Sequence, residues 1–282
     1  MKKLIIILGV VGAAFSAIFV RMSTLPASVL VFYRMLFAII GICPSLIISH
    51  RSEITALRPN QIMGPVLSGI CLGCHFICYF MSLSYTSIAS SVVLVDTEIF
   101  FVAIVSIFIF KEKQSLIGWI SIVITFVGSM IVAGGDILNG NIWGDILALS
   151  GAVFVSVYTV LGKRARKNMS TSVYTCIVYA CAGVVALIFS IINNYSMAIG
   201  TVNNLLAAIG IALFSTLLGH SIFSWGLKYE KASFVSIAKL LEPIFASVLG
   251  IFIFKEVPGV TSCIGGILII LGISMFSILH EK

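Results

Sequence analysis

The chain has 282 residues, of which 60% are hydrophobic and only 10% are charged, and its mean hydropathy is +1.19. A soluble domain usually carries about 25% charged residues, so this composition excludes a water-soluble globular protein. The net charge of +7 would suggest a nucleic-acid partner for a soluble protein, but here the basic residues lie in short breaks between apolar stretches, where they indicate membrane orientation.

Apolar stretches of about 20 residues recur along the whole chain, which is the length that a helix needs to cross about 30 Å of hydrocarbon. The pattern predicts an all-α polytopic membrane protein with ten transmembrane helices. The expected spans, in chain order, are 3–20, 27–49, 62–82, 87–110, 115–134, 143–161, 171–192, 203–226, 232–254 and 259–279. No small-residue cleavage site follows the first stretch, so we interpret it as an uncleaved helix and not as a signal peptide.

Lysine and arginine are divided unequally between the two sides of this arrangement. With the N-terminus in the cytoplasm, most of them fall on the cytoplasmic side, and only Arg21 and Lys255 fall in loops on the other side. Positive charge marks the cytoplasmic side of membrane proteins. The sequence therefore predicts a multi-pass protein of the plasma (inner) membrane with both termini in the cytoplasm.

The six residues IFIFKE occur twice, at 107–112 and at 251–256. The same ungapped shift, the distance from 107 to 251, also pairs Glu98 with Glu242 and Gly128 with Gly272. We expect two repeats of five helices each, residues 1–135 and residues 136–282. Because five is odd, the second copy enters the membrane from the opposite side, and inverted repeats of this kind are common in carriers.

Four stretches carry a recognisable pattern: FSAIFVRMSTLPASVLVFYRMLFA, YTSIASSVVLV, GHSIFSWGLKYEKASFVSIAKLLEPIFASVLGIFIFKE and GGILIILGI. They resemble the EamA repeats of the drug/metabolite transporter superfamily, and the similarity covers essentially the whole chain. The resemblance implies a carrier for amino acids, nucleotide-related compounds or other metabolites, without naming the substrate. One departure concerns Ile99, which follows Glu98 where the family usually has proline, so we expect the first half to lack the kink that Pro243 provides in the second.

Ionisable side chains at membrane depth cost roughly 2.5–3.5 kcal/mol each on insertion scales and therefore mark partners or cavities. Asp96 and Glu98 are two residues apart, so on one helix they cannot both face one cavity squarely, and we expect one of them to face a neighbouring helix. Lys239 and Glu242 are three apart and share a helix face, which predicts an ion pair between them. On this basis Glu98 has no nearby cation and is the better candidate for carrying protons. Pro243 would bend the ninth span and free the carbonyl group of residue 239.

Five further side chains are candidates for the substrate pathway. His75 and His220 lie at nearly equivalent positions in the third and eighth spans. Each could accept a proton, contact the substrate, or be a buried histidine that bonds to a neighbouring helix. Tyr79 and Phe223 could line a cavity for an organic ligand, or belong to an interfacial aromatic belt. Arg34 could snorkel to the outer surface or attract an anionic group of a substrate.

These features predict a secondary transporter, and not an enzyme, that moves a small organic metabolite such as an amino acid by alternating access, and they favour export over import. Its partners would be that substrate, protons and the lipid bilayer, with no cofactor and no nucleic acid. Alternatives are a multidrug or soft-metal efflux carrier, the latter because Cys71, Cys74, His75 and Cys78 share a helix face, or a membrane-embedded lipid-modifying enzyme or accessory subunit. The sequence leaves the substrate and the oligomeric state open.

Overall fold

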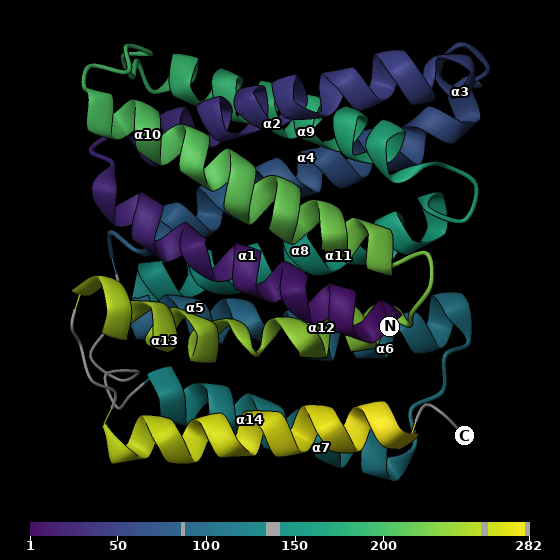
Figure 1. The fold of residues 1–282 in the computed structure, drawn as a ribbon, viewed down its shortest axis with the longest axis vertical. Coiled ribbons are helices and arrows are strands. Elements are labelled where there is room, and N and C mark those ends of the chain that lie inside the picture. The colour runs from purple at the N-terminus through teal and green to yellow at the C-terminus, as the bar shows by residue number, and fades with distance from the viewer. Residues whose placement is uncertain (86–87, 134–141, 255–258, 280–282) are drawn as a thin grey trace.

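The computed structural model describes residues 1–85, 88–133, 142–254 and 259–279, and these residues form helices joined by short connections. The helices lie side by side, and the chain reverses direction at the two ends of the bundle (Figure 1). The start of the chain and the end of its last helix lie at the same end, where the Lys3 ammonium group donates to the Ser277 carbonyl oxygen at 2.9 Å. We call this the terminal end. At the opposite end, the backbone amide of Thr24 donates to the Asn204 side chain at 2.8 Å.

The first part of the chain forms seven helices within the residues that the structure describes. They are α1 (Lys2–Met22), α2 (Ala27–Ser49), α3 (Arg51–Thr55), α4 (Pro59–Ser82), α5 (Ile88–Asp96), α6 (Glu98–Phe110) and α7 (Leu116–Ala133). The second part continues the helical pattern. Its elements are α8 (Ile142–Ala165), α9 (Thr171–Ile192), α10 (Val202–Gly210), the π-helix η2 (Ile211–His220), α11 (Ser221–Gly226), α12 (Ala232–Lys239), α13 (Glu242–Phe254) and α14 (Val260–Leu279).

The all-helical prediction is confirmed, and the predicted spans 27–49 and 171–192 have the same bounds as α2 and α9. Seven helices among the described residues are long and apolar enough to cross a membrane, and two further apolar helices, Leu116–Val132 and Cys263–Ile278, are shorter. The positions of several helix starts follow from local chemistry. Ser170 and Thr201 accept hydrogen bonds from backbone amides in the first turns of α9 and α10, as N-cap residues do.

The fourth and ninth predicted spans are each interrupted at the middle. Between α5 and α6, the backbone amide and the hydroxyl group of Thr97 both donate to the Leu94 carbonyl oxygen, at 3.3 and 2.6 Å. Between α12 and α13, the amides of Leu240 and Leu241 bond to carbonyl groups three residues earlier. Such bonds tighten the chain into a 3₁₀ turn, and Pro243 in the first turn of α13 fits a helix start.

The expectation that the first half lacks a kink is therefore wrong. A threonine hydroxyl that donates to a backbone carbonyl group of the preceding turn bends a helix, and Thr97 makes such a bond to Leu94. The helix break at Thr97 lies one residue before Glu98, just as the break at Leu241 lies one residue before Glu242. The two broken spans thus present an acidic residue at equivalent positions without sharing a proline.

The eighth predicted span contains a π-helix of ten residues, η2. Its wider turns are seen in the backbone amide of Ser221, which bonds to the Thr216 carbonyl oxygen five residues earlier. π-Helical turns are rare and lie frequently at functional sites. The wider turns alter which residues of this span face inward, and the polar residues Ser215, Thr216 and His220 all belong to η2.

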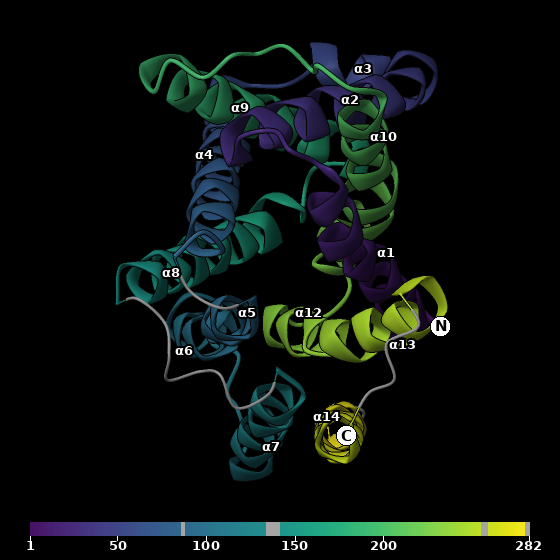
Figure 2. The same ribbon diagram turned by 90° about the vertical axis from the view of Figure 1, so that its left-hand side faces the viewer.

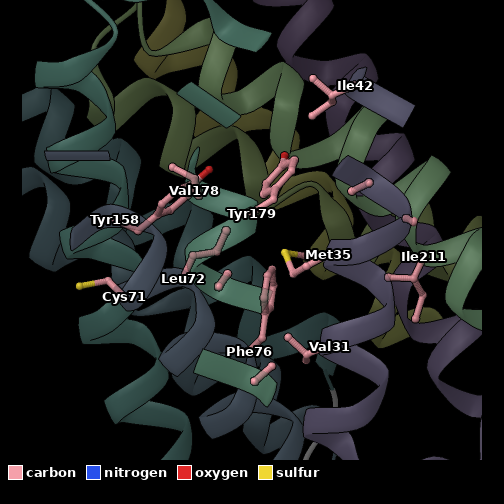
Figure 3. Packing of buried hydrophobic residues seen from close by; sticks show 14 of the residues in the cluster. Val31, Met35, Ile42, Cys71, Leu72, Phe76, Tyr158, Val178, Tyr179 and Ile211 are labelled. Atoms are coloured by element: carbon pink, nitrogen blue, oxygen red, sulfur yellow. The ribbon is translucent and has the colours of Figure 1, made fainter. Parts of the chain in front are cut away.

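Two clusters of buried side chains fill the bundle. The first joins α2, α4, α8, α9 and η2, with Met35, Leu72, Phe76 and Tyr179 among its members (Figure 3). The second joins α1, α6, α12 and α14, and Phe223 belongs to it. Figure 2 shows α4 and α8 on one side of the bundle, α1 and α10 on the other, and α5 and α12 between them.

The helices α7 and α14 form a pair at one edge of the bundle (Figures 1 and 2). Their backbones approach closely at glycine: a Cβ atom added at Gly128 would lie 2.7 Å from the Gly265 carbonyl oxygen, and one added at Gly272 would lie 2.8 Å from the Ser121 carbonyl oxygen. Small residues permit this kind of contact between membrane helices. The pair joins the last helices of the two predicted repeats.

Candidate functional site

A cavity lies where the two buried clusters meet, with Phe76 of the first cluster and Phe223 of the second in its wall. Its empty volume, mouth included, is about 710 Å³. The side chains around it come from both halves of the chain. Its ionisable or polar lining includes Arg34, His75, Tyr79, Asp96, Glu98, His220, Lys239 and Glu242.

One ion pair links the two halves of the chain inside the cavity. The ammonium group of Lys239, at the end of α12, lies 2.9 Å from Oε1 of Glu98, in the first turn of α6. The predicted pair between Lys239 and Glu242 is wrong. Because α12 ends at Lys239 and the chain leaves α-helical geometry before Glu242, a spacing of three residues no longer brings the two side chains within ion-pair distance, although both line the cavity. The other carboxylate oxygen of Glu98 is buried and makes no hydrogen bond.

Two further acids line the same cavity. Glu242 begins α13 and is half-buried, and within the described ranges its side chain makes no hydrogen bond or ion pair. Asp96 accepts a hydrogen bond from the hydroxyl group of Ser129 in α7 at 2.7 Å. Asp96 and Glu98 both line the cavity, because the break at Thr97 separates them into two helices, and Asp96 also bonds to a neighbouring helix, as we expected for one of the two acids.

Arg34 is buried in the cavity wall, with 1% of its surface exposed. Its Nε donates to the Thr216 hydroxyl group at 2.7 Å and its Nη2 to the Ser215 hydroxyl group at 3.2 Å. The guanidinium carbon lies 3.9 Å from the centre of the Phe76 ring. The snorkelling interpretation is therefore wrong, because the hydroxyl groups of η2 and the Phe76 ring hold this side chain inside the bundle.

The two histidines have different surroundings. Nδ1 of His75 donates to the Gly151 carbonyl oxygen of α8 at 3.0 Å, and the imidazole ring stacks on Tyr79 with 6.1 Å between ring centres. His75 thus makes a hydrogen bond to a neighbouring helix, which was one of the alternatives expected for it. In contrast, Nδ1 of His220 is buried without a hydrogen-bond partner, and the ring lies edge-on to Phe76 and Phe223.

Aromatic side chains complete the wall. Phe76, Tyr79, Phe80 and Phe223 all line the cavity, so Tyr79 and Phe223 lie where a ligand could contact them. Pro243 itself does not line it, although it belongs to the turn of α13 that carries Glu242. The cavity therefore combines charged groups from both halves with apolar and aromatic surface, as small-molecule sites do.

Two segments of the chain, residues 2–134 and 142–278, match the model of the EamA-like transporter family. The chain belongs to this family. Together with its long apolar helices, this membership identifies it as a multi-pass membrane transporter.

Several proteins resemble this EamA-like transporter. An uncharacterized transporter of Clostridium kluyveri is 28% identical over 198 residues, which cover 68% of this chain and 64% of that protein. The pseudopaline exporter CntI of Pseudomonas aeruginosa is 23% identical over 251 residues, 88% of this chain and 85% of that protein. A solved crystal structure with 16% identity and a TM-score of 0.82 covers 100% of this chain and 99% of its own, which shows a shared fold.

The terminal end of this EamA-like transporter carries a second polar network. The Lys163 ammonium group in α8 lies 2.8 Å from Oε1 of Glu112 and 2.7 Å from the Glu230 carbonyl oxygen. Nearby, the Gln114 side chain donates to the Ser233 hydroxyl group at 2.9 Å. Glu112 ends the first IFIFKE copy, whereas Lys255 and Glu256 of the second copy lie outside the described residues.

Sequence reasoning missed two polar residues that shape this site, Ser215 and Thr216, which anchor Arg34. Both residues belong to the π-helix η2, and the sequence of η2 carries no signal that we recognise for π-helical turns. The partner of Lys239 was missed for a related reason. Each error comes from treating a span as one regular helix.

Proposed function

We propose that this protein is a secondary transporter that exports a small organic metabolite, an amino acid or a related compound, across the plasma membrane by alternating access. The observation that carries the proposal is the polar cavity, which receives charged side chains from both halves of the chain. Membrane segments tolerate such groups where they line a substrate pathway. The pathway would include Arg34, His75, Tyr79, Glu98, His220, Phe223, Lys239 and Glu242.

We further propose ten membrane crossings, arranged as two inverted repeats of five. Two separate family matches, 2–134 and 142–278, agree with repeats of residues 1–135 and 136–282. Helices broken at the middle of the membrane are a recurrent feature of carriers with inverted repeats, and here both breaks lie next to equivalent glutamates, Glu98 and Glu242. The basic residues of the loops favour the cytoplasm for the terminal end.

Export of an organic compound has one direct parallel, because a relative is named a pseudopaline exporter. Soft-metal transport has less support, since the described residues contain no group of three His, Cys, Asp or Glu side chains placed to hold a metal ion. For a lipid-modifying enzyme we would expect acid-base groups near an interface. The acids of the cavity instead lie next to the breaks in the middle of the fourth and ninth spans.

Alternating access requires one side of the cavity to close when the other opens. In this conformation the contacts of Lys163 with Glu112 and with the Glu230 carbonyl group join α8, the end of α6 and the turn before α12 at the terminal end. We propose that these contacts hold the terminal end closed here and separate in the opposite state. The cytoplasmic entrance would then open between α6, α8 and α12.

Purified protein in liposomes tests the function without any other subunit. The experiment would load vesicles with radiolabelled amino acids, nucleosides or vitamins and follow their efflux. We expect efflux of at least one class above that of protein-free vesicles, saturable by unlabelled compound. Absence of flux for the whole panel, with chemical conversion of a lipid instead, would contradict the proposal.

A further inference from the structure

We infer that the substrate is a zwitterion with one carboxylate group and one ammonium group, that Arg34 binds its carboxylate, and that Glu242 faces its ammonium group. The inference rests on the proposed function, because it assigns the ligand of the same cavity. It follows from which charged side chains of the cavity have partners in the protein and which do not.

Arg34 and Lys239 are the arginine and lysine of the cavity lining. Lys239 has a counter-ion, because its ammonium group lies 2.9 Å from Glu98. Arg34 has no counter-ion in contact: within the described residues no carboxylate lies within 4.0 Å of it, Glu242 acts on it only from beyond that distance, and its hydrogen-bond partners are the neutral hydroxyl groups of Ser215 and Thr216. A buried charge without a counter-charge is costly. An anionic group of a ligand would supply the missing charge.

The guanidinium group of Arg34 is held in one orientation. Nε is held by Thr216, one hydrogen of Nη2 by Ser215, and the plane of the group is covered by Phe76. Nη1 makes no hydrogen bond to any described residue of the protein. The edge formed by Nη1 and Nη2 therefore has N–H groups to spare in a fixed direction, and such an edge binds a carboxylate through two parallel hydrogen bonds.

The balance of charge in the cavity lining excludes a strongly anionic ligand. Lys239 is already neutralised by Glu98, so Arg34 is the cation of the lining with no anionic partner among the described residues. Two more acids, Asp96 and Glu242, line the same cavity and would repel a dianion such as a phosphate ester. A single carboxylate fits this balance of charge better.

The acid of the cavity that would face the ammonium group of the ligand is Glu242. Asp96 has a hydrogen-bond donor in Ser129, whereas the side chain of Glu242 has no hydrogen bond and no ion pair in the described part of the protein. Glu242 and Arg34 therefore each lack an ion-pair partner in contact, and their opposite charges act on each other only across the same cavity. One zwitterionic molecule would satisfy both groups, and the aromatic side chains Tyr79, Phe80 and Phe223 would contact its remaining atoms.

The test compares amino acids with analogues that lack one charge, using the wild-type protein. Binding of each L-amino acid to the solubilised protein would be measured beside its amide, which keeps the ammonium group, and its N-acetyl form, which keeps the carboxylate. Loss of a charge-assisted hydrogen bond costs about 1.5–3 kcal/mol, so we expect each analogue of the bound amino acid to bind about tenfold more weakly or worse. Equal binding of an amino acid and its amide would overturn the inference.

Variants assign the two charges to residues. Arg34→Gln should remove the preference for the acid over the amide, Arg34→Lys should retain part of it, and Glu242→Gln should remove the preference for the free amine over the N-acetyl form. Arg164→Gln serves as the matched control, since Arg164 is exposed at the terminal end of α8. A folded Arg34→Gln protein that still prefers the acid would contradict the assignment. If a variant does not fold, the comparison of analogues on wild-type protein still decides.

The failure of this inference can be told apart from failure of the proposed function. Liposome flux of amines or neutral compounds, with no requirement for a carboxylate, would overturn the zwitterion assignment and leave the transporter standing. Absence of flux for every compound tested would overturn the proposed function, and the assignment with it.

Discussion

The pair formed by Lys239 and Glu98 connects α12 to α6 across the centre of the bundle. Both side chains are largely removed from solvent, with 13% and 5% of their surfaces exposed. Removing one partner of a buried pair leaves the other charge without compensation, whereas replacing both by apolar groups is often tolerated. The pair is therefore a structural bond between the two halves as well as part of the cavity wall.

We predict that Glu98→Gln lowers the thermal stability and the yield of folded protein, because it leaves the Lys239 ammonium group without a counter-ion. Breaking a buried pair in this way costs about 3–5 kcal/mol in soluble proteins. The double variant Glu98→Gln with Lys239→Met should recover part of the loss. Glu230→Gln is the control, since the contacts described for Glu230 use its backbone amide and carbonyl groups. Unchanged melting of Glu98→Gln would show that the pair does not stabilise the fold.

For Glu242 the expectation is different, because this carboxyl group has no cation partner among the described residues. The charged groups that share its cavity are Asp96, Glu98, Lys239 and Arg34. Proton carriage, which the sequence led us to expect of Glu98, is here proposed for Glu242 instead, because Glu98 is already bound to Lys239. A carboxyl group without a partner can exchange a proton with the cavity as access changes sides.

We predict that Glu242→Gln folds like wild type but weakens the response of transport to an imposed pH gradient. The measurement is efflux from liposomes with and without the gradient, normalised to the amount of folded protein. Asp96→Asn is the comparison variant, because Asp96 also lines the cavity but already accepts a hydrogen bond from Ser129. If Glu242→Gln responds to the gradient as wild type does, Glu242 does not couple protons to transport.

At the scale of elements, the helices and their approximate bounds could be predicted from the sequence, because apolar length alone requires a spanning helix. The interruptions could be predicted only in part. Pro243 marked one of them, but the break at Thr97 depends on a hydroxyl group that does not by itself mark a helix break, and we recognise no pattern in the sequence of η2 that predicts its π-helical turns. Since these irregular turns set the partners of Lys239 and Arg34, the sequence identified several side chains that line the cavity but not their contacts, and it missed Ser215 and Thr216.

The network at the terminal end gives an element-scale prediction. Lys163→Met removes the contacts to Glu112 and to the Glu230 carbonyl group, so the ends of α6 and α8 should separate more often. The test uses a protein without its native cysteines, with one cysteine placed at Val155 in the cavity wall. In inverted vesicles, whose cytoplasmic face is outward, this cysteine should then react faster with an impermeant thiol reagent. Arg164→Met is the control. Equal labelling rates in both variants would show that Lys163 does not restrict access.

At the scale of the whole molecule, the proposed topology places the terminal end in the cytoplasm and the connection between α9 and α10 outside. Exposed positions at the two ends are Lys228 and Ala198. In intact cells we predict that an impermeant maleimide labels a cysteine introduced at Ala198, and labels one introduced at Lys228 only after the membrane is permeabilised. The reverse pattern would invert the orientation.

The measurement that tests the central claim most directly is counterflow in liposomes that contain only the purified protein. Vesicles preloaded with an unlabelled amino acid that binds the protein are diluted into a trace of the labelled form. The account predicts transient accumulation of label inside, abolished by Arg34→Gln and retained by Arg164→Gln. Accumulation no greater than in protein-free vesicles, from wild-type protein that binds the same compound, would contradict a carrier that alternates access around this cavity.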